Sequence, residues 1–523
     1  MLSRRTFLAA GGAVLATPSI AQSSASRVLK FIPQSDVTVL DPIWTTAYVT
    51  RNHGLAVFDT LYGIDATFTA QPQMVAGHVV ENDGKVWKLT LRDGLKFHDG
   101  SPVLARDCVA SIVRWTKRDT FGQTLMAYTD EIGAPDDKTI QFRLKKPFAL
   151  LPDALGKVGS SICAIMPERL AKTDAFTQVT EMVGSGPFRF KADERVVGAK
   201  VVYERFADYV PREGGATEWT AGPKRAFVDR VEWTVFPDEA TSAAAMRARE
   251  IDWWENPSAD MIPVLKGLQI PLANRTGFIG CMRLNQLQPP FDNPAIRRVL
   301  LQAVEQDDYM IAVTGSDPKL RTTPVGVFCP GMPMETKAGL DVFTRKRDYA
   351  AVKKALAAAG YKGEKVVLLG ATDQAALKAL SDVSADVLAQ SGFNVDYQIM
   401  DWGTVVQRRV KKDSVANGGW SAMCTFWAGL DQANPAVSAF LRGQGEGGAF
   451  GWPKSEKLEA LRQEWLDAPD LPAQKTLAET IQLQAFQDVP YVPLGQYQGL
   501  TAFQPNVTGV LEGPAMFWNV RKG

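Results

Sequence analysis

A change of local structure in mid-chain, between Phe278 and Gln306, constrains the fold more than any other segment. Residues 278–284 form an apolar run of strand length, and two prolines at 289 and 290 then interrupt it. Asn293 and Pro294 predict a helix start, because asparagine caps a first turn and proline suits the first helical position. Apolar residues follow at helical spacing, namely Ile296, Val299, Leu300, Ala303 and Val304. A strand, a wide turn and a new helix indicate that the chain leaves one lobe here and begins another.

The second half of the chain continues this alternation. Helical patterns over 349–360 and 376–391 alternate with apolar, strand-like segments over 366–369, 393–400 and 420–427. Alternating strands and helices with buried strands predict an α/β lobe.

Length and charge narrow the class of protein. The 523 residues, 46% of them hydrophobic, are enough for two or more domains. The 58 basic and 57 acidic residues leave a net charge of +1, which points neither to nucleic acid nor to an anionic membrane. Only three histidines occur, and the five cysteines include no CxxC pair, so we expect no metal site of the common zinc kinds and no cofactor.

The N-terminus reads as an export signal. Residues 3–8, SRRTFL, are similar to the twin-arginine motif, and the weakly apolar run that follows is too short to span a bilayer. Small residues at Ser19 and Ala21 predict cleavage after Ala21. With no cysteine directly after the apolar run, we expect no lipid or membrane anchor, and a mature protein in the periplasm.

Several segments together resemble one family. Residues 91–115, LRDGLKFHDGSPVLARDCVASIVRW, match its signature over nearly their whole length, and 182–190, MVGSGPFRF, match a second segment. Leu40-Asp41-Pro42 and the 278–306 stretch add two more. The chain thus resembles the family 5 extracellular solute-binding proteins, the peptide-, opine- and nickel-type receptors of ABC importers. Leu104 replaces the threonine that usually caps this helix in the family. Because leucine has no side-chain acceptor, the helix near Ala105 is predicted to have a shifted or frayed start.

The resemblance implies the fold class: α/β, periplasmic binding protein type II-like, with two unequal α/β lobes, a hinge and an interlobe ligand cleft. Lobe 1 would comprise 22–280 and 496–523, with an extra subdomain at about 71–183, and lobe 2 would comprise 281–495. The chain would cross between lobes near 278–285 and 490–498. Hinge closure over the ligand would be what the ABC permease, with its ATPase subunits, recognises. We expect a monomer.

The resemblance also suggests a ligand. In peptide receptors of the family an aspartate after the last strand of this lobe pairs with the ligand's α-ammonium group, and Asp431 is the only acid in the corresponding loop, 428–435. A di- or oligopeptide is therefore the leading ligand, with an opine, a sugar or a small aromatic acid as alternatives. The predicted cleft wall is Trp44, Tyr48, Trp254, Trp427, Asp431 and Tyr497.

Other functions stay open at this stage. An exported hydrolase or redox enzyme is the rival, although Ser185 lacks the spacing of a hydrolase nucleophile elbow and His98 reads as a turn residue. A chaperone or sensor on the same fold would differ only in its partner. The G-x-G-x-x-G at 443–448 lacks the flanking strand and helix of a dinucleotide site and predicts a loop. Cys281 and Cys424 are predicted either to form a disulfide or to stay buried free thiols.

Overall fold

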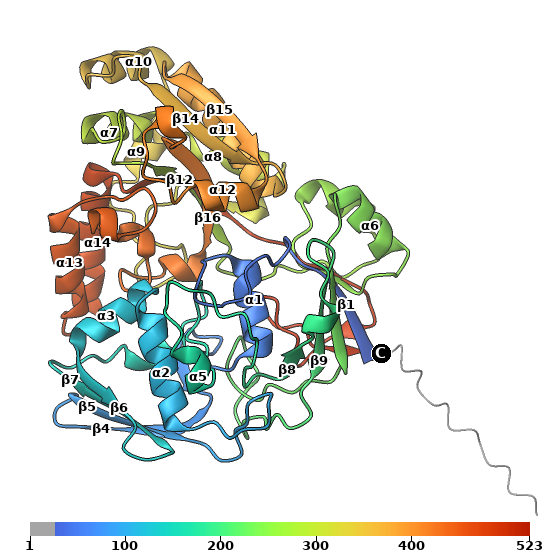
Figure 1. Ribbon diagram of the computed structural model, residues 1–523. Helices are drawn as coiled ribbons and strands as arrows, with labels where there is room; N and C mark the ends of the chain where they lie inside the picture. The colour runs from blue at the N-terminus through green and yellow to red at the C-terminus, as the bar shows by residue number, and fades with distance from the viewer. Residues whose placement is uncertain (1–26) are drawn as a thin grey trace, which may run out of the picture.

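The computed structural model describes residues 27–523, so the predicted twin-arginine signal and its cleavage after Ala21 lie outside the described residues. The chain forms a lower and an upper body, stacked one above the other in Figure 1. Each is built on its own six-stranded sheet. No helix within 27–523 combines the length and the apolar character needed to cross a bilayer.

The first sheet lies in the lower body and gathers strands from both ends of the chain. β1 pairs in parallel with β10 and β11, and β18 joins the far edge of β11. Its strands, in spatial order, are β18 (Ala502–Phe503), β11 (Trp253–Trp254), β1 (Val28–Ile32), β10 (Arg230–Thr234), β9 (Lys200–Arg205) and β8 (Phe188–Phe190). Helices α1 (Tyr48–Val57) and α6 (Glu239–Arg247) belong to the same body. Aromatic rings of Phe31, Trp233, Trp253 and Phe517 fill the core at this sheet.

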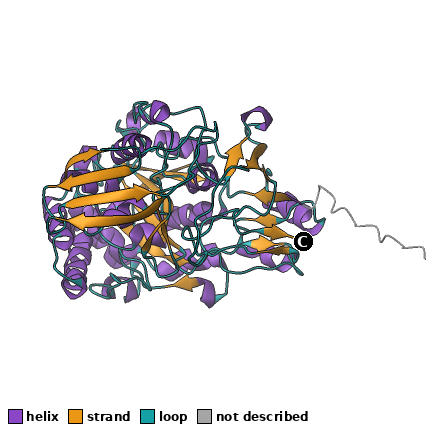
Figure 2. Ribbon diagram, turned by 90° about the horizontal axis from the view of Figure 1, so that it is seen from below, coloured by secondary structure: helices purple, strands orange, loops and turns teal. Residues whose placement is uncertain are grey.

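A separate antiparallel sheet forms within the segment predicted as an extra subdomain. Its order is β4 (Val75–Glu81), β5 (Val86–Leu91), β7 (Thr139–Leu144) and β6 (Thr129–Gly133). Helices α2 (Ala105–Thr116) and α3 (Thr120–Tyr128) cover one face, and the view from below in Figure 2 shows the other face free of helices. Short elements complete the lower body: β2 (Tyr62–Ile64), β3 (Ala70–Pro72), α4 (Leu151–Leu155), α5 (Glu168–Ala171), β19 (Val507–Thr508) and β20 (Arg521–Lys522).

Helix α2 begins cleanly at Ala105, against the prediction of a weak start. Leu104 offers no side-chain acceptor, but the Asp107 carboxylate accepts a hydrogen bond from the Leu104 backbone N–H at 2.8 Å. The third residue of the helix thus stabilises the turn that the missing threonine would have capped.

The second sheet, in the upper body, is mixed. β12 lies between β16 and β17, antiparallel to both, and β14 lies between β16 and β15, parallel to both. Its strands, in spatial order, are β13 (Arg321–Thr322), β17 (Tyr491–Tyr497), β12 (Phe278–Leu284), β16 (Ala422–Ala428), β14 (Lys365–Ala371) and β15 (Asn394–Met400). The helices of this body are α7 (Pro294–Ala303), α8 (Gln306–Thr314), α9 (Asp341–Thr344), α10 (Tyr349–Ala358), α11 (Ala375–Gln390), α12 (Trp402–Arg408), α13 (Glu456–Leu466) and α14 (Leu471–Asp488). The predicted start of α7 is confirmed, because Asn293 Oδ1 accepts from the backbone N–H of Ala295 at 2.9 Å.

Two chain segments join the bodies, and they lie side by side. The backbone N–H of Ala273 donates to the carbonyl of Gly499 at 2.8 Å, and that of Thr501 donates to the carbonyl of Pro271 at 3.0 Å. The segments then enter β12 and leave β17, where Phe278 pairs with Tyr497. The two crossings thus form one connection between the bodies, which are called lobes 1 and 2 below.

Candidate functional site

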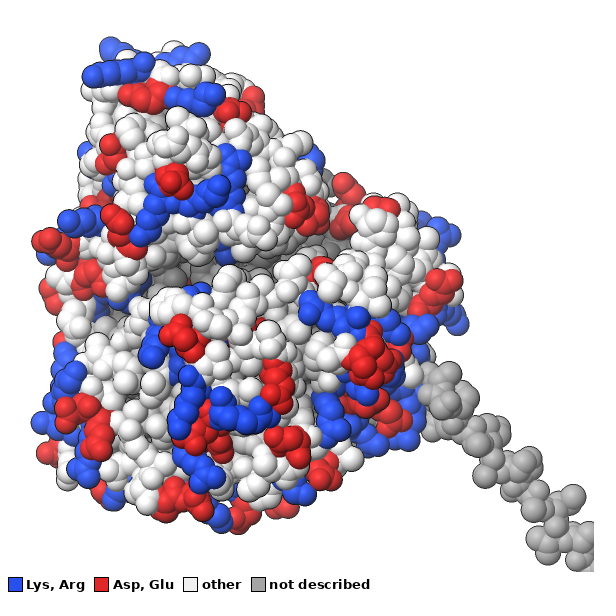
Figure 3. Space-filling model, in the orientation of Figure 1, with Lys and Arg blue, Asp and Glu red and all other residues white. Residues whose placement is uncertain are grey.

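A groove separates the two lobes, and Figure 3 shows it as a recess running across the molecule. Its larger cavity has a volume of about 340 Å³. Lobe 1 contributes residues 32–36 and 256–259, and lobe 2 contributes 373–376 and Phe426. Residues 497–500 of the crossing close one side. Because both lobes line this outer cavity, its shape depends on how far they close.

Aromatic rings form one wall of the outer cavity. Phe278, Phe426 and Tyr497 come from neighbouring ends of β12, β16 and β17. The centroid of the Phe278 ring lies 5.1 Å from that of Phe426 and 5.5 Å from that of Tyr497. Trp254, at the end of β11, lines the cavity from lobe 1. Such rings suit the apolar parts of a small ligand.

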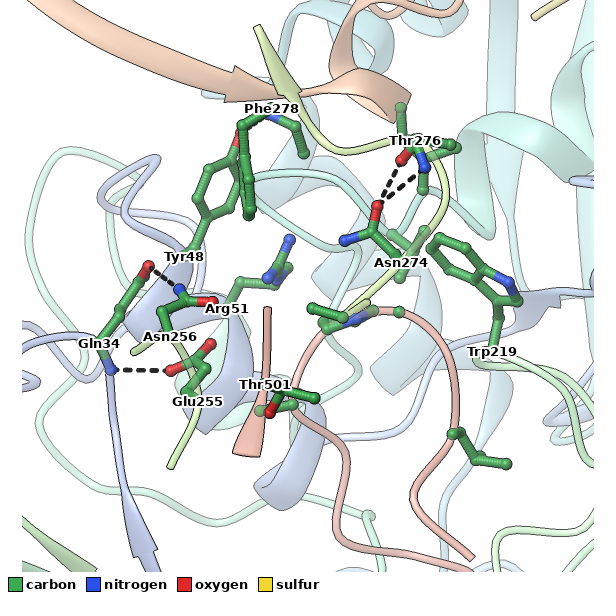
Figure 4. Close-up of a pocket in the computed structure, with 18 of the residues that line it drawn as sticks. Gln34, Tyr48, Arg51, Trp219, Glu255, Asn256, Asn274, Thr276, Phe278 and Thr501 are labelled. Carbon is green, nitrogen blue, oxygen red and sulfur yellow. Dashed lines mark hydrogen bonds between the residues drawn. The ribbon is translucent and has the colours of Figure 1, made fainter. Parts of the chain in front are cut away.

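An inner cavity of about 40 Å³ adjoins the outer one, and the two share Gln34, Asn256 and Phe278 as lining residues. Its wall includes the polar side chains of Arg51, Glu255, Asn274 and Thr276, and Figure 4 shows their arrangement. The crossing segment is fixed here by Asn274 Oδ1, which accepts from the Thr276 hydroxyl at 2.8 Å and from the backbone N–H of Gly277 at 2.9 Å.

Tyr48 and Asp431 connect the two lobes behind these cavities. The Tyr48 hydroxyl donates to Asp431 Oδ2 at 2.8 Å and accepts from the Ala428 backbone N–H at 2.5 Å. Asp431 Oδ1 accepts from the Ser160 backbone N–H of lobe 1 at 3.1 Å. Burial raises the pKa of the Asp431 carboxyl, and the nearby Lys157 ammonium opposes that rise. Burial and the charge of Asp431 raise the pKa of the Tyr48 hydroxyl.

Arg51 and Glu255 place opposite charges in the inner cavity. Glu255 Oε1 accepts from the Asn52 side-chain amide at 2.6 Å, and its Oε2 accepts from the Gln34 backbone N–H at 2.8 Å. Burial raises the pKa of Glu255 and lowers that of Arg51. The arrangement offers a cation, a carboxyl group and several amide groups, which is the chemistry of polar-ligand binding.

Residues 69–447 match the family described as Bacterial extracellular solute-binding proteins, family 5 Middle. The chain belongs to this family. A probable peptide ABC transporter periplasmic-binding protein of Sinorhizobium fredii is 37% identical over 534 residues, covering 100% of this chain and 99% of that protein.

Solved structures agree on the fold. A periplasmic binding protein of A. tumefaciens R10, in complex with agropinic acid, superposes with a TM-score of 0.80 at 20% identity, covering 95% of this chain and 99% of that one. A dipeptide-binding protein of Pseudoalteromonas sp. SM9913, in complex with Met-Leu, gives 0.78 at 19% identity, covering 95% and 100%. At these identities the likeness shows the fold alone, and it confirms the predicted fold class.

The predicted wall residues of this solute-binding protein fall into three groups. Tyr48 lines the inner cavity, and Trp254 and Tyr497 line the outer one. Asp431 is buried beside Tyr48, with its carboxylate directed at lobe 1. The other two, Trp44 and Trp427, line neither cavity. As ligand contacts, all six stay predictions.

Trp44 and Trp427 have other neighbours. Trp44 lies under the Arg118 guanidinium, which is 5.8 Å from its ring centroid. Trp427 packs on Phe440, with ring centroids 4.6 Å apart. Successive side chains of a strand point to opposite faces, so on β16 it is Phe426 that reaches the cavity and Trp427 that turns away. Sequence reasoning missed four lining residues, namely Phe426, Phe278, Arg51 and Glu255. For Phe426, strand alternation shows that it and Trp427 point to opposite faces, but not which face lines the cleft.

His98 and Ser185, which were weighed for catalysis, are buried among structural partners, and so is His53. His98 Nε2 lies 3.0 Å from the carbonyl oxygen of Gly186, and burial lowers the pKa of its imidazole to about 4. His53 Nδ1 lies 2.9 Å from the Tyr203 hydroxyl, and burial lowers its pKa to about 3. Ser185 is buried, and its hydroxyl accepts from the backbone N–H of Asp59 at 3.4 Å. Within residues 27–523 no group of three histidine, cysteine or acidic side chains is placed to hold a metal.

Cys281 and Cys424 are free buried thiols, which answers the question that the sequence left open. In the pairing of β12 with β16, Cys281 is opposite Thr425 and Cys424 is opposite Met282. Directly opposed residues share a face and neighbours alternate, so the two thiols point to opposite sides of the sheet. Cys424 Sγ instead lies 3.0 Å from the Ser384 hydroxyl.

Proposed function

We propose that this solute-binding protein is the periplasmic receptor of an ABC importer that captures a di- or oligopeptide between its lobes. It would deliver the solute, chemically unchanged, to a membrane permease driven by ATPase subunits. The observation that carries the proposal is the outer cavity, whose wall is built from both lobes and from the crossing between them.

The cavity limits ligand size. Its volume of about 340 Å³ lies near the lower end of the roughly 300–1,000 Å³ that small-molecule sites span. This favours a dipeptide or another small solute over a long peptide. The Sinorhizobium fredii relative, named for peptide transport, supports the peptide class. An opine, a sugar or a small aromatic acid is the alternative within the same receptor role.

Capture would work by closure. A ligand that touches Trp254 in lobe 1 and Phe426 in lobe 2 binds the closed form better than the open form, and so shifts the population toward closure. The closed form is then what the permease recognises. We further propose that the chain is exported as a monomer by the twin-arginine route, and that its lobes divide where the chain enters β12 and leaves β17.

Native mass spectrometry of the protein purified from the periplasm of its own cells tests the proposal. We expect a one-to-one complex with a small solute, released intact by denaturation and bound again when the apoprotein is mixed with it. A released compound that the apoprotein chemically alters on incubation would overturn the receptor function in favour of an enzyme.

A further inference from the structure

Arg51 is a buried cation that forms no salt bridge with the described residues. Its side chain is 7% exposed, and no carboxylate in residues 27–523 lies within salt-bridge distance of it. Nε and Nη2 donate to one acceptor, the Asn52 side-chain oxygen, at 3.2 and 3.0 Å. Nη1 has no hydrogen-bond acceptor in the described part of the chain, yet it is not sealed off from the cavity. In Figure 4 the guanidinium points into the space between Tyr48 and Asn274.

Two other buried arginines, Arg114 and Arg297, are satisfied within the protein. Arg114 pairs with Asp41, with Nη2 and Oδ2 2.6 Å apart, and also donates to two carbonyls. Arg297 donates to the carbonyls of Phe291, Asp292 and Asp488. Burying a guanidinium is costly unless its N–H groups are paired. Arg51 therefore differs from these two. Arg409 also has a buried N–H group without an acceptor among the described residues, but its guanidinium lies over the rings of Trp402 and Phe450 and lines neither cavity, whereas Arg51 lines the inner one.

Neither of the two nearby acids pairs with the Arg51 guanidinium. Glu255 and Asp431 are the carboxyl groups whose charges act on Arg51. Glu255 already accepts from Asn52 and Gln34, and Asp431 already accepts from Tyr48 and Ser160. Both are thus engaged by other donors, and the end of the guanidinium that carries Nη1 faces the inner cavity.

The ring of Tyr48 orients the Arg51 guanidinium. Its central carbon lies 4.5 Å from the centroid of the Tyr48 ring, a cation–π contact that fixes its plane. Nη2 uses one of its two N–H groups for Asn52, so its other N–H and the parallel N–H of Nη1 can together bind a carboxylate through two hydrogen bonds. The inner cavity, about 40 Å³, exceeds the roughly 10–15 Å³ that one water needs, so it has room for a small planar group.

We infer that Arg51 is a specificity-determining residue that binds a free carboxylate of the solute in the inner cavity, while the solute's apolar body lies in the outer cavity against Trp254, Phe278 and Tyr497. The inference rests on the proposed function and narrows it: the solute is a small acid with an apolar part. A peptide would enter with its C-terminal carboxylate toward Arg51.

Isothermal titration with matched acids and amides tests this. The probes are the dipeptide Met-Leu, its C-terminal amide and its N-acetyl form, together with an N-carboxyalkyl amino acid and its diamide. We expect each acid that binds to bind about 10- to 100-fold more tightly than its amide. Arg51→Met should remove this preference, and Arg51→Lys should keep part of it because the charge remains while the paired donors are lost.

Arg118→Met is the matched control, because Arg118 also lies over an aromatic ring in lobe 1 but lines neither cavity. It should leave the acid preference intact. Equal binding of acid and amide by the unaltered protein, or an unchanged preference in Arg51→Met, would overturn the inference alone. Failure of every probe to bind would overturn the proposed ligand class, and with it the inference.

Discussion

Replacing Tyr48 by phenylalanine should open the two lobes. The hydroxyl joins α1 of lobe 1 to Asp431 and Ala428 of lobe 2, at 2.8 and 2.5 Å, and both partners are buried. A hydrogen bond to a charged group contributes about 1.5–3 kcal/mol, and a buried donor left unpaired costs about 1–3 kcal/mol. We therefore expect Tyr48→Phe to cost the closed form roughly 2–4 kcal/mol, while in the open form water solvates the same groups.

This free-energy cost changes the populations of the closed and open forms. At about 1.4 kcal/mol for each factor of ten, the closed-to-open ratio should fall by about 30- to several-hundred-fold. The apparent ligand affinity falls with the closed fraction. A second contact between the lobes, from Tyr128 and Lys146 to Asp467, leaves Asp467 with 42% of its side chain exposed, so it should hold the lobes only weakly.

Single-molecule energy transfer measures the populations directly. Because all five native cysteines are buried, labels can be placed selectively on Arg247→Cys in α6 and Lys354→Cys in α10, two exposed positions in different lobes. The control is Tyr209→Phe, which removes a hydroxyl bonded to the Asp59 carboxylate at 2.8 Å within lobe 1. If Tyr48→Phe and Tyr209→Phe give the same distribution of transfer efficiencies as the parent, the Tyr48 contact does not hold the lobes together.

Three further predictions concern single residues. Gly159→Ala would place a Cβ 1.9 Å from Asp431 Oδ1, so we expect a more open molecule and weaker ligand binding by the same energy-transfer and titration assays. Lys224→Ala leaves Asp59 buried without its ion pair, whose Nζ–Oδ1 distance is 2.7 Å with both side chains 0% exposed, and it should lower the free energy of unfolding in urea by about 3–5 kcal/mol. Burial raises the pKa of the Asp153 carboxyl from 3.8 to about 6. The stability that this carboxyl contributes is therefore fully present below pH 4 and is lost as the pH rises through 6. Asp153→Asn should flatten that part of the pH profile of the melting temperature.

Two control variants and two contrary outcomes check these predictions. Gly133→Ala meets no atom within 4 Å and should change neither closure nor binding. Lys96→Ala breaks a pair with Asp208 whose side chains are 46% and 56% exposed, and should cost less than about 1 kcal/mol. Equal losses in Lys224→Ala and Lys96→Ala would refute the burial argument. A pH profile unchanged by Asp153→Asn would show that this carboxyl ionises normally in the folded protein.

Much of the fold could be predicted from the sequence, because its signals are local. The capped start at Asn293 gives α7, and the pattern over 376–391 gives α11, which the structure has at Ala375–Gln390. The start of α2 was the exception. Its cap is replaced by Asp107, a residue three positions downstream that sequence reasoning did not weigh.

The site could be predicted only in part. Tyr48, Trp254 and Tyr497 lie at the cavities as expected, but Arg51 and Glu255 are 204 positions apart and meet only because β11 pairs with β1 beside α1. No local pattern contains that pairing. The resemblance singled out Asp431 for a ligand ammonium group, whereas the structure places its carboxylate against Tyr48 and Ser160 of lobe 1.

The central claim is that one solute is held by both lobes at once, and hydrogen–deuterium exchange with and without a probe that binds tests it most directly. We predict slower exchange at 32–36, 254 and 256–259 of lobe 1 together with 373–376 of lobe 2 and the crossing at 497–500, because these residues line the same cavity. Protection confined to the segments of a single lobe would contradict the account.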